Sequence, residues 1–343
     1  MHVWTHTSPE AIAEAAERWR SSRRVTGRDL RWLTVLSAGL GHDPYLLEAC
    51  EDGLPIGILP LARVKSLLFG SFLVSLPYLN WAGVVAERDD VAQELLDSAI
   101  GLADMLDVDH LELRNEREFS HRALTETLET KANMRLPIAG GMDAVWNQLK
   151  SVVRTQVRKG RGQGFSIDWG SVELLDDFYE VFAQNMRDLG TPVYGRSLFR
   201  AALLDLRPDA ELCVVRIDGR PIAGALAVHG RGTTEVPSAS VERRYRSTAA
   251  NSFMYWELIC RAIERGQQMF DFGRSTIDSG TYTFKRKWGA LPQPAVWQYY
   301  RRRGHVADIR PDGGKYDRMI EIWKRIPVPI TKLIGPWIVR GIP

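Results

Sequence analysis

The sequence predicts an α/β (α+β) fold in which one lobe, a mixed sheet flanked by helices, occurs twice in tandem. Three observations lead to this prediction. Each half has an Asp-Gly turn between apolar runs, a helix and a strand follow that turn in both halves, and short stretches match. Asp52-Gly53-Leu54-Pro55-Ile56 matches Asp218-Gly219-Arg220-Pro221-Ile222 at an offset of 166, and Leu111-Glu112-Leu113 matches Phe270-Asp271-Phe272 at an offset of 159. Two matches in the same order indicate an internal duplication.

The first half opens with an amphipathic segment from Pro9 to about Arg20, which predicts a helix capped by Ser8. Asp52-Gly53 supplies the positive φ that a tight turn needs, so we expect a hairpin with strands at residues 45–50 and 56–64. A helix at residues 90–104 and a strand at residues 110–114 are predicted to follow.

The second half repeats this order. Around Asp218-Gly219 we expect strands at residues 211–216 and 222–228, followed by a helix at 249–264 and a strand at 269–272. The sequence therefore divides into an N-terminal lobe at 1–140, a C-terminal lobe at 141–300, and an amphipathic tail at 301–343. Residues 141–164 are expected to form a connecting helix with a basic carboxyl end made of Arg154, Arg158, Lys159 and Arg161.

Composition limits the functional classes. A chain of 343 residues that is 45% hydrophobic has enough apolar side chains for two domains, and a formal net charge of +3 argues against a general polyanion binder. No metal site is expected, because the cysteines and the histidines considered lack ligand spacing and no CxxC pair is present. These residues are Cys50, Cys213, Cys260, His42, His110, His121 and His229.

Three segments bear on location. Residues 1–9 lack the pattern of a secretory signal, so a cytoplasmic protein is expected. Residues 66–86 carry no charge, but Gly70, Pro77, Asn80 and Gly83 favour strand-turn-strand over a membrane helix. The tail at 319–343 alternates apolar residues with Lys and Arg and carries Trp323 and Trp337. It fits either peripheral contact with the inner face of the cytoplasmic membrane or docking on its own domain.

The densest group of chemically useful residues lies between Phe270 and Gly289, where a strand ends in a predicted anion-binding loop. Gly273 and Gly280 allow close backbone approach, Arg274 and Lys285 are cations, and Ser275 and Thr281 offer hydroxyls. In the alternative interpretation, the glycines only turn the chain and Lys285 is solvated.

A second anion site is predicted where Arg243, Arg244 and Arg246 precede the amino end of the helix at 249–264. Asn251 and Tyr255 are four residues apart and are expected to line a pocket. Other residues of this helix are expected in the core: Phe253, Trp256, Cys260 and Ile263. In the first lobe, Asn80, Trp81 and Gly83 are candidates for lining an acceptor cleft, although packing is the simpler role for Trp81.

The stretch Phe270–Gly289, with Trp256-Glu257 upstream, resembles the FemAB-type, GNAT-like acyltransferases, and more narrowly the branch associated with exosortase and PEP-CTERM exopolysaccharide loci. The resemblance includes the basic residues at 154–164, the strand at 235–240 and the tail from Tyr316 through Trp323-Lys324 and Gly335-Pro336 to Pro343. Pro237 stands where we expect Trp in that family's strand.

The resemblance implies two GNAT-like lobes, of the acyl-CoA N-acyltransferase type, and metal-free transfer of an acyl or aminoacyl group to an amine. It implies no tightly bound cofactor and a donor that is acyl-CoA, acyl-carrier protein or aminoacyl-tRNA. The expected acceptor is a small-molecule or lipid-linked saccharide of the cell envelope or an exopolysaccharide. The turn at 243–251 corresponds to the one that holds the acyl-CoA pyrophosphate in GNAT enzymes.

Direct acyl transfer also needs a proton acceptor, and positive charge where the oxyanion develops. Asp271 and Glu235 are the expected acceptors, and Lys285 and Arg274 the expected cations. Asp271 has the alternative role of fixing a neighbouring turn. Two other functions stay open: a tRNA or nucleic-acid-binding module that uses the basic residues at 154–161, and a catalytically inactive scaffold of an exopolysaccharide assembly system.

Overall fold

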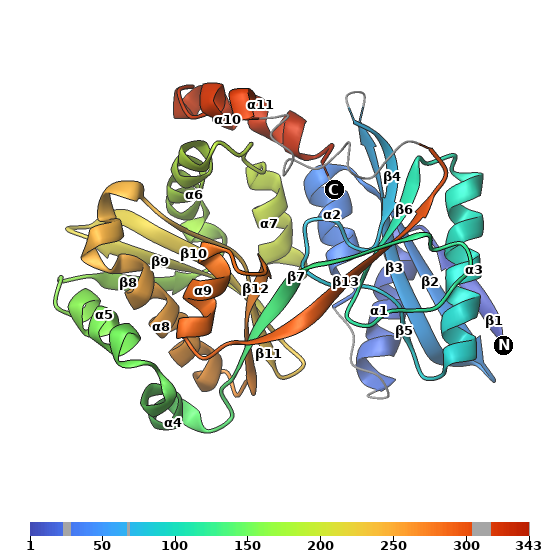
Figure 1. Cartoon of the computed structure of the whole chain (residues 1–343), viewed down its shortest axis with the longest axis horizontal. Helices are drawn as coiled ribbons and strands as arrows, with labels where there is room; N and C mark the ends of the chain where they lie inside the picture. Colours follow the sequence, from blue (N-terminus) through green and yellow to red (C-terminus); the bar gives the residue numbers. More distant parts are fainter. Residues whose placement is uncertain (23–28, 67–68, 304–316, 343) are drawn as a thin grey trace. The chain divides into compact units, whose positions relative to one another are not determined.

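The computed structural model describes residues 1–22, 29–66, 69–303 and 317–342 (Figure 1). Two residues named in the family resemblance, Tyr316 and Pro343, lie outside this part. The chain divides into two compact units. Unit 1 comprises Met1–Lys131, Pro294–Lys315 and Trp337–Pro343, and unit 2 comprises Ala132–Gln293 and Tyr316–Pro336.

Unit 1 is a mixed sheet with helices packed on it. Its strands lie in the order β1 (His2–His6), β2 (Asp43–Glu51), β3 (Leu54–Ser66), β4 (Gly70–Val74), β6 (His110–Asn115) and β13 (Leu291–Arg301), and the short β5 (Val85–Ala86) pairs with β3. Its helices are α1 (Pro9–Ser22), α2 (Trp32–Leu40) and α3 (Asp89–Met105). The α3 face with Val91, Leu95 and Leu102 is buried in the core.

The predicted elements of the first half are confirmed. Ser8 Oγ accepts a hydrogen bond from the Ala11 amide at 3.2 Å, as a cap of α1 does. Asp52 and Gly53 have φ values of 51° and 77°, which gives the β2–β3 hairpin its tight turn. The described part of residues 66–86 is strand and turn rather than helix. Nowhere in the described residues does a helix have the length and apolar character needed to cross a membrane.

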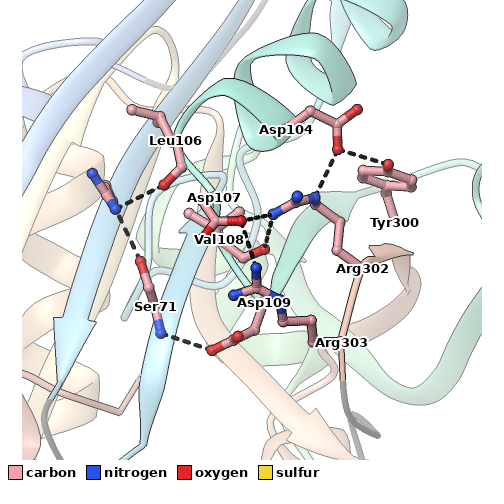
Figure 2. A network of polar contacts seen from close by, with 10 residues as sticks. Ser71, Asp104, Leu106, Asp107, Val108, Asp109, Tyr300, Arg302 and Arg303 are labelled. Carbon is pink, nitrogen blue, oxygen red and sulfur yellow. Dashed lines mark hydrogen bonds and ion pairs between the residues drawn. The ribbon is translucent and has the colours of Figure 1, made fainter.

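A polar network fixes the carboxyl end of β13 in unit 1 (Figure 2). Arg302 pairs with Asp104 at 2.8 Å and with Asp107 at 2.9 Å, and Arg303 also pairs with Asp107 at 2.7 Å. Tyr300 donates a hydrogen bond to Asp104 at 2.8 Å. These contacts, together with antiparallel pairing of β13 with β6, assign residues 294–303 to the first unit rather than to a C-terminal lobe that runs to residue 300.

The strands of unit 2 lie in the order β7 (Glu126–Pro137), β12 (Met269–Thr276), β11 (Thr233–Val241), β10 (Arg220–Gly230), β9 (Ala210–Ile217) and β8 (Ser166–Gly170). Helices α5 (Ser151–Arg161) and α8 (Ala250–Glu264) pack on one face, and α6 (Leu175–Leu189) and α7 (Arg196–Asp205) on the other (Figure 1). The remaining helices are α4 (Gly141–Gln148), α9 (Gly280–Lys287), α10 (Asp317–Trp323) and α11 (Val328–Val339), with short 3₁₀ turns at Val172–Leu174 and Arg243–Thr248. The end of α11, from Trp337 on, belongs to unit 1.

The strands that frame the site separate within this sheet. Parallel pairing joins Thr233–Glu235 of β11 to Met269–Asp271 of β12. Beyond these residues β11 continues to Val241 and β12 to Thr276, and in the described chain the two strands no longer pair with each other. On its other side β11 pairs with β10, and a bulge shifts the register between Leu226 and Val228. Pro237 lies opposite this bulge, where its missing N–H costs no ladder hydrogen bond.

Three expectations differ from the structure. The connecting basic helix is two helices, because Leu149 and Lys150 have extended ψ values of 139° and 146°. The segment at 270–289 is not a loop: β12 continues to Thr276, and α9 begins after Ser279, whose Oγ accepts a hydrogen bond from the Tyr282 amide at 3.2 Å. The tail is not a separate part, since residues 316–336 belong to unit 2 and Arg187 of α6 donates to the Lys324 carbonyl at 3.0 Å.

Candidate active site

Unit 2 holds a pocket of about 490 Å³ where β11 has separated from β12. Its wall is built by α5, α6, the end of β11, the start of α8 and the helix α9. Six of the residues expected at the site line it: Arg246, Asn251, Tyr255, Gly280, Thr281 and Lys285. The sequence suggested two separate anion sites, at 243–255 and at 280–285. In the structure both segments line the same cavity.

Lys285 is the most unusual group in this wall. It is only 8% exposed, and its Nζ donates hydrogen bonds to the carbonyl oxygens of Gly273 and Arg274, both at 3.0 Å. Burial lowers the pKa of Lys285 to about 8, an effect that Asp271 opposes and Arg274 reinforces. The solvated lysine of the alternative interpretation is therefore excluded, and the amine can exchange a proton near neutral pH.

Asp271 is buried and is not part of the pocket wall. It is 1% exposed, its Oδ1 accepts a hydrogen bond from the Gly273 amide at 2.7 Å, and its Oδ2 pairs with Arg135 Nε at 3.1 Å. Gly273 has a φ of 78°, so the Asp271 carboxylate stabilises a left-handed turn at Gly273. The Gly273 carbonyl oxygen then accepts the hydrogen bond from Lys285. These contacts match the turn-fixing role that was the alternative for Asp271.

The other predicted residues of β11 and β12 do not line the pocket. Glu235 lies beside Asp271 in the parallel register. Gly273 and Arg274 contribute carbonyl oxygens to Lys285. Ser275 is buried, and its Oγ has no hydrogen-bond partner. The structure therefore brings the lysine to the cavity and leaves both proposed proton acceptors, Asp271 and Glu235, outside its wall.

Two buried polar residues of the wall were not predicted. Asn185 of α6 donates from Nδ2 to Ser240 Oγ of β11 at 3.1 Å, and the two residues are 8% and 3% exposed. Asn185 follows Phe178 and Val181 on the buried face of α6, so a polar residue at the apolar period was a readable signal. The pocket wall also contains Gln156, Leu189, Ser252 and Phe284, which were not among the predicted site residues.

The turn before α8 is held by α5. Lys159 Nζ donates to the Ser247 carbonyl at 2.8 Å, and Ala249 takes a φ of 65° just before the helix begins. Only Arg246 of the three predicted arginines lines the pocket, whereas Arg244 pairs with Glu242 at 2.6 Å. The turn therefore offers one arginine and the first residues of a helix to a ligand.

The basic residues of α5 are engaged within unit 2. Arg154 donates to the Leu149 carbonyl at 2.9 Å, and Lys159 holds the turn before α8. Arg158 lies over the Trp146 ring at 5.5 Å, and Arg161 pairs with Glu257 at 3.5 Å. This pattern is structural, and it weakens the prediction of a nucleic-acid-binding helix.

Unit 1 has a smaller pocket of about 270 Å³. Trp81 and Gly83 line it, together with Phe119 and Arg117, whereas Asn80 is not in its wall. A Cβ on Gly83 would lie 1.8 Å from Asn115 Oδ1, so close packing requires this glycine. No lysine lines this pocket, in contrast to the pocket of unit 2.

Comparison with known proteins gives one family match, and it lies within unit 2. Residues 147–286 match the family model described as "Acetyltransferase (GNAT) domain". A search of curated proteins gave no match. Solved structures share the fold at low identity. The FemX crystal structure has a TM-score of 0.65 at 16% identity and covers 88% of this chain and 98% of its own.

Two further structures agree. L-PGS from Bacillus licheniformis has a TM-score of 0.59 at 14% identity, covering 96% of this chain and 98% of its own. A tandem GNAT protein from the clavulanic acid biosynthesis pathway has a TM-score of 0.55 at 11% identity, covering 89% and 100%. The predicted fold is thus confirmed as two GNAT-like lobes. Residues 147–286 match the acetyltransferase (GNAT) domain model, and the chain is an acyltransferase.

Proposed function

We propose that the chain transfers an acyl group from a thioester to an amine of a cell-envelope precursor, and that Lys285 carries the chemistry in the pocket of unit 2. The supporting observation is a buried lysine in the wall of a pocket inside a GNAT domain, with its pKa lowered to about 8. A surface lysine would not have this property.

The reaction forms a carbon–nitrogen bond and breaks the carbon–sulfur bond of the donor. The amine attacks the thioester carbonyl, charge develops on its oxygen, and the sulfur leaves and takes a proton. An ammonium group has three N–H donors, and the Gly273 and Arg274 carbonyls take two from Lys285. We assign the remaining donor to the oxyanion and to the departing sulfur.

The proton lost by the amine needs an acceptor. Asp271 and Glu235 stay candidates by residue type, but the Asp271 carboxylate is committed to Gly273 and Arg135. We propose Asp271 as a positioning residue and Glu235, acting through solvent, as the acceptor. Gly273, Arg274 and Ser275 then belong to the support of Lys285 rather than to the ligand contacts.

The donor we propose is an acyl-CoA, the donor that GNAT domains use. Arg246, Asn251 and Ser252 line the end of the pocket at the start of α8, where N–H groups and an arginine suit a phosphate. Acyl-carrier protein and aminoacyl-tRNA remain the other candidate donors. No Asp or Glu is among the described residues that line the pocket, so an aminoacyl α-ammonium would lack an anionic partner, and this favours a simple acyl group.

The acceptor we propose is an amine on a saccharide, lipid-linked or free, used in exopolysaccharide or cell-envelope synthesis. Two observations support it: the fold is similar to those of FemX and of L-PGS, and the motif at 270–289 resembles the exosortase and PEP-CTERM-associated branch. A cytoplasmic location goes with this proposal, because acyl-CoA is a cytoplasmic metabolite.

The test uses the purified full chain with a series of acyl-CoA donors and amino-sugar acceptors. Release of free CoA thiol and the mass of the acylated acceptor are measured together, for the parent, for Lys285→Met and for the control Lys287→Met. Lys287 is exposed on the same helix, so its loss should leave the rate unchanged. We expect the rate to fall only in Lys285→Met. Equal rates in the two variants would remove Lys285 from the mechanism.

The alternatives have their own readouts. A tRNA-binding module would bind tRNA with a steep salt dependence and would not change CoA thiol release. A scaffold would bind no donor in equilibrium dialysis with acetyl-CoA. Either result, with a folded protein, would contradict the proposed acyl transfer.

A further inference from the structure

Helix α11 turns its large apolar side chains to solvent. Ile330, Leu333, Ile334 and Trp337 follow the i, i+3, i+4, i+7 spacing of one helical face. They are 48%, 71%, 36% and 67% exposed. An ordinary surface helix of a globular protein buries this stripe, so the orientation of α11 is reversed.

The opposite face of α11 is buried, and it consists of Thr331, Gly335 and Val339. Thr331 is fully buried, and a Cβ on Gly335 would come within 2.8 Å of the Val193 amide nitrogen. Close approach of the helix therefore depends on glycine at this position. Because α11 packs through this face, its larger apolar side chains at 330, 333, 334 and 337 are left on the surface.

Helix α10 extends the same property. Met319 and Ile322, three residues apart, are 61% and 62% exposed, whereas the neighbouring Trp323 is buried. Of the 17 large apolar side chains that are exposed in the described residues, six lie between 319 and 337. A concentration of this kind marks an interaction surface.

The charge of the tail points to the partner. Residues 317–343 contain five basic and two acidic side chains, a formal charge of +3. The whole chain has 45 basic and 42 acidic residues, so the rest holds 40 of each and is neutral. The guanidinium of Arg340 lies 4.3 Å from the centre of the Trp337 ring, which places a cation directly beside the apolar stripe.

We propose that α10 and α11 form a lipid-binding surface that lies on an anionic bilayer. We name it the tail surface, with Met319, Ile322, Ile330, Leu333, Ile334 and Trp337 as its apolar part. Tryptophan and arginine at the edge of an apolar stripe suit the boundary between head groups and acyl chains. A twelve-residue helix is about 18 Å long, against about 30 Å for the hydrocarbon core, so α11 lies in the plane of the interface.

Positive charge favours this partner over an apolar protein groove, because anionic lipids attract each basic residue near the surface. The inference does not depend on the acyl-transfer proposal, since it concerns neither Lys285 nor the pocket. Binding to a bilayer would also bring the enzyme close to a lipid-linked acceptor.

The test is flotation of the full chain with vesicles. One set contains phosphatidylcholine alone, and the other contains phosphatidylcholine mixed with phosphatidylglycerol. We expect binding to the mixed vesicles and at least about tenfold weaker binding to the neutral ones. The double variant Leu333→Ser/Trp337→Ser should lose binding to both. The matched control, Met105→Ser/Leu204→Ser, removes two exposed apolar residues elsewhere and should bind like the parent.

A second variant separates the charge from the apolar contact. Arg325→Gln/Arg340→Gln should keep the fold, measured by circular dichroism, and lose the preference for anionic vesicles. Light scattering of the free protein tests the alternative that the tail surface binds a second copy of the chain. A dimer that Leu333→Ser/Trp337→Ser disrupts, with no vesicle binding by the parent, would overturn the proposal. Equal flotation of both double serine variants would do the same.

Discussion

The Lys285 ammonium donates a hydrogen bond to the carbonyl oxygen of Gly273 at 3.0 Å, and this contact ties α9 to the turn in β12. The turn is itself held by Asp271, which accepts from the Gly273 amide at 2.7 Å. Asp271, Gly273 and Lys285 thus form a chain of contacts that starts in the core and ends at the pocket. The electrostatics of this chain determine how the site responds to substitution and to pH.

Replacing Lys285 by Met should lower kcat/KM by about 10² to 10³, the usual loss when one oxyanion donor is removed. Met has nearly the same length and no charge, so the buried position tolerates it. Steady-state release of CoA thiol measures the effect, with Lys287→Met as the control. A loss of less than about threefold would show that the lysine is structural.

The pH profile should fall on the alkaline side near pH 8. Burial lowers the pKa of Lys285 from its ordinary 10.5 to about 8, so the ammonium donor is present below that pH and is lost above it. If the donor is required, kcat declines as pH rises through about 8. The measurement is kcat between pH 6 and about 10. A profile that stays flat across this alkaline range contradicts the assignment of the donor.

Asp271→Asn should both destabilise the fold and move the alkaline limb to lower pH. Asp271 raises the pKa of Lys285 against the effect of burial, so removing its charge lowers that pKa further. The substitution also removes the ion pair with Arg135, whose side chain is 14% exposed, at a cost of about 3 kcal/mol. Thermal melts and the pH profile are recorded together.

The double variant Asp271→Asn/Arg135→Met is the control for this interpretation, because it removes both members of the ion pair. It should regain part of the stability while keeping the shifted pH profile. Loss of activity with no shift of the limb would instead make Asp271 a proton acceptor.

The local parts of this fold and site were accessible from sequence. The Asp-Gly hairpins at 52–53 and 218–219 depend on residues within the turn, and both have the predicted positive φ values. Asn251 and Tyr255, and likewise Gly280 and Lys285, were found because each pair lies in one short segment. The alternation of residues in β12 also indicates which side of the strand is buried, since Phe270 and Phe272 are in the core with residues of α8.

The parts that were missed depend on distant partners. Asn185 and Ser240 are 55 residues apart in sequence and meet only because α6 packs on the end of β11. Arg135 is 136 residues from Asp271, so nothing in the local pattern marks it. The break between α4 and α5 falls at Leu149-Lys150, where neither Gly nor Pro signals it. Ser279 was a readable cap for α9, but Gly280 in the next position favoured a loop.

Asn185→Leu should reduce activity by about tenfold with little change in stability. Asn185 Nδ2 donates to Ser240 Oγ, and we expect the carboxamide oxygen to accept a substrate N–H in the pocket. Leucine has a similar volume, so the apolar contacts of α6 are kept. Michaelis constants for donor and acceptor show which substrate is affected, and Gln184→Leu in the same helix is the control. An unchanged KM for both substrates would make the residue part of the packing.

Gly160→Ala should weaken donor binding although Gly160 does not touch the pocket. A Cβ at Gly160 would lie 2.8 Å from Phe253 Cβ, so α5 must move away from α8. That displacement moves Lys159, which holds the turn before α8 through the Ser247 carbonyl, and with it Arg246. Overpacking of this kind costs about 1 to 3 kcal/mol of stability. Gly162→Ala is the matched control, because its Cβ would meet nothing closer than 3.5 Å. Binding of acetyl-CoA by calorimetry should weaken in Gly160→Ala alone, and equal binding in both variants would separate the α5–α8 contact from the donor site.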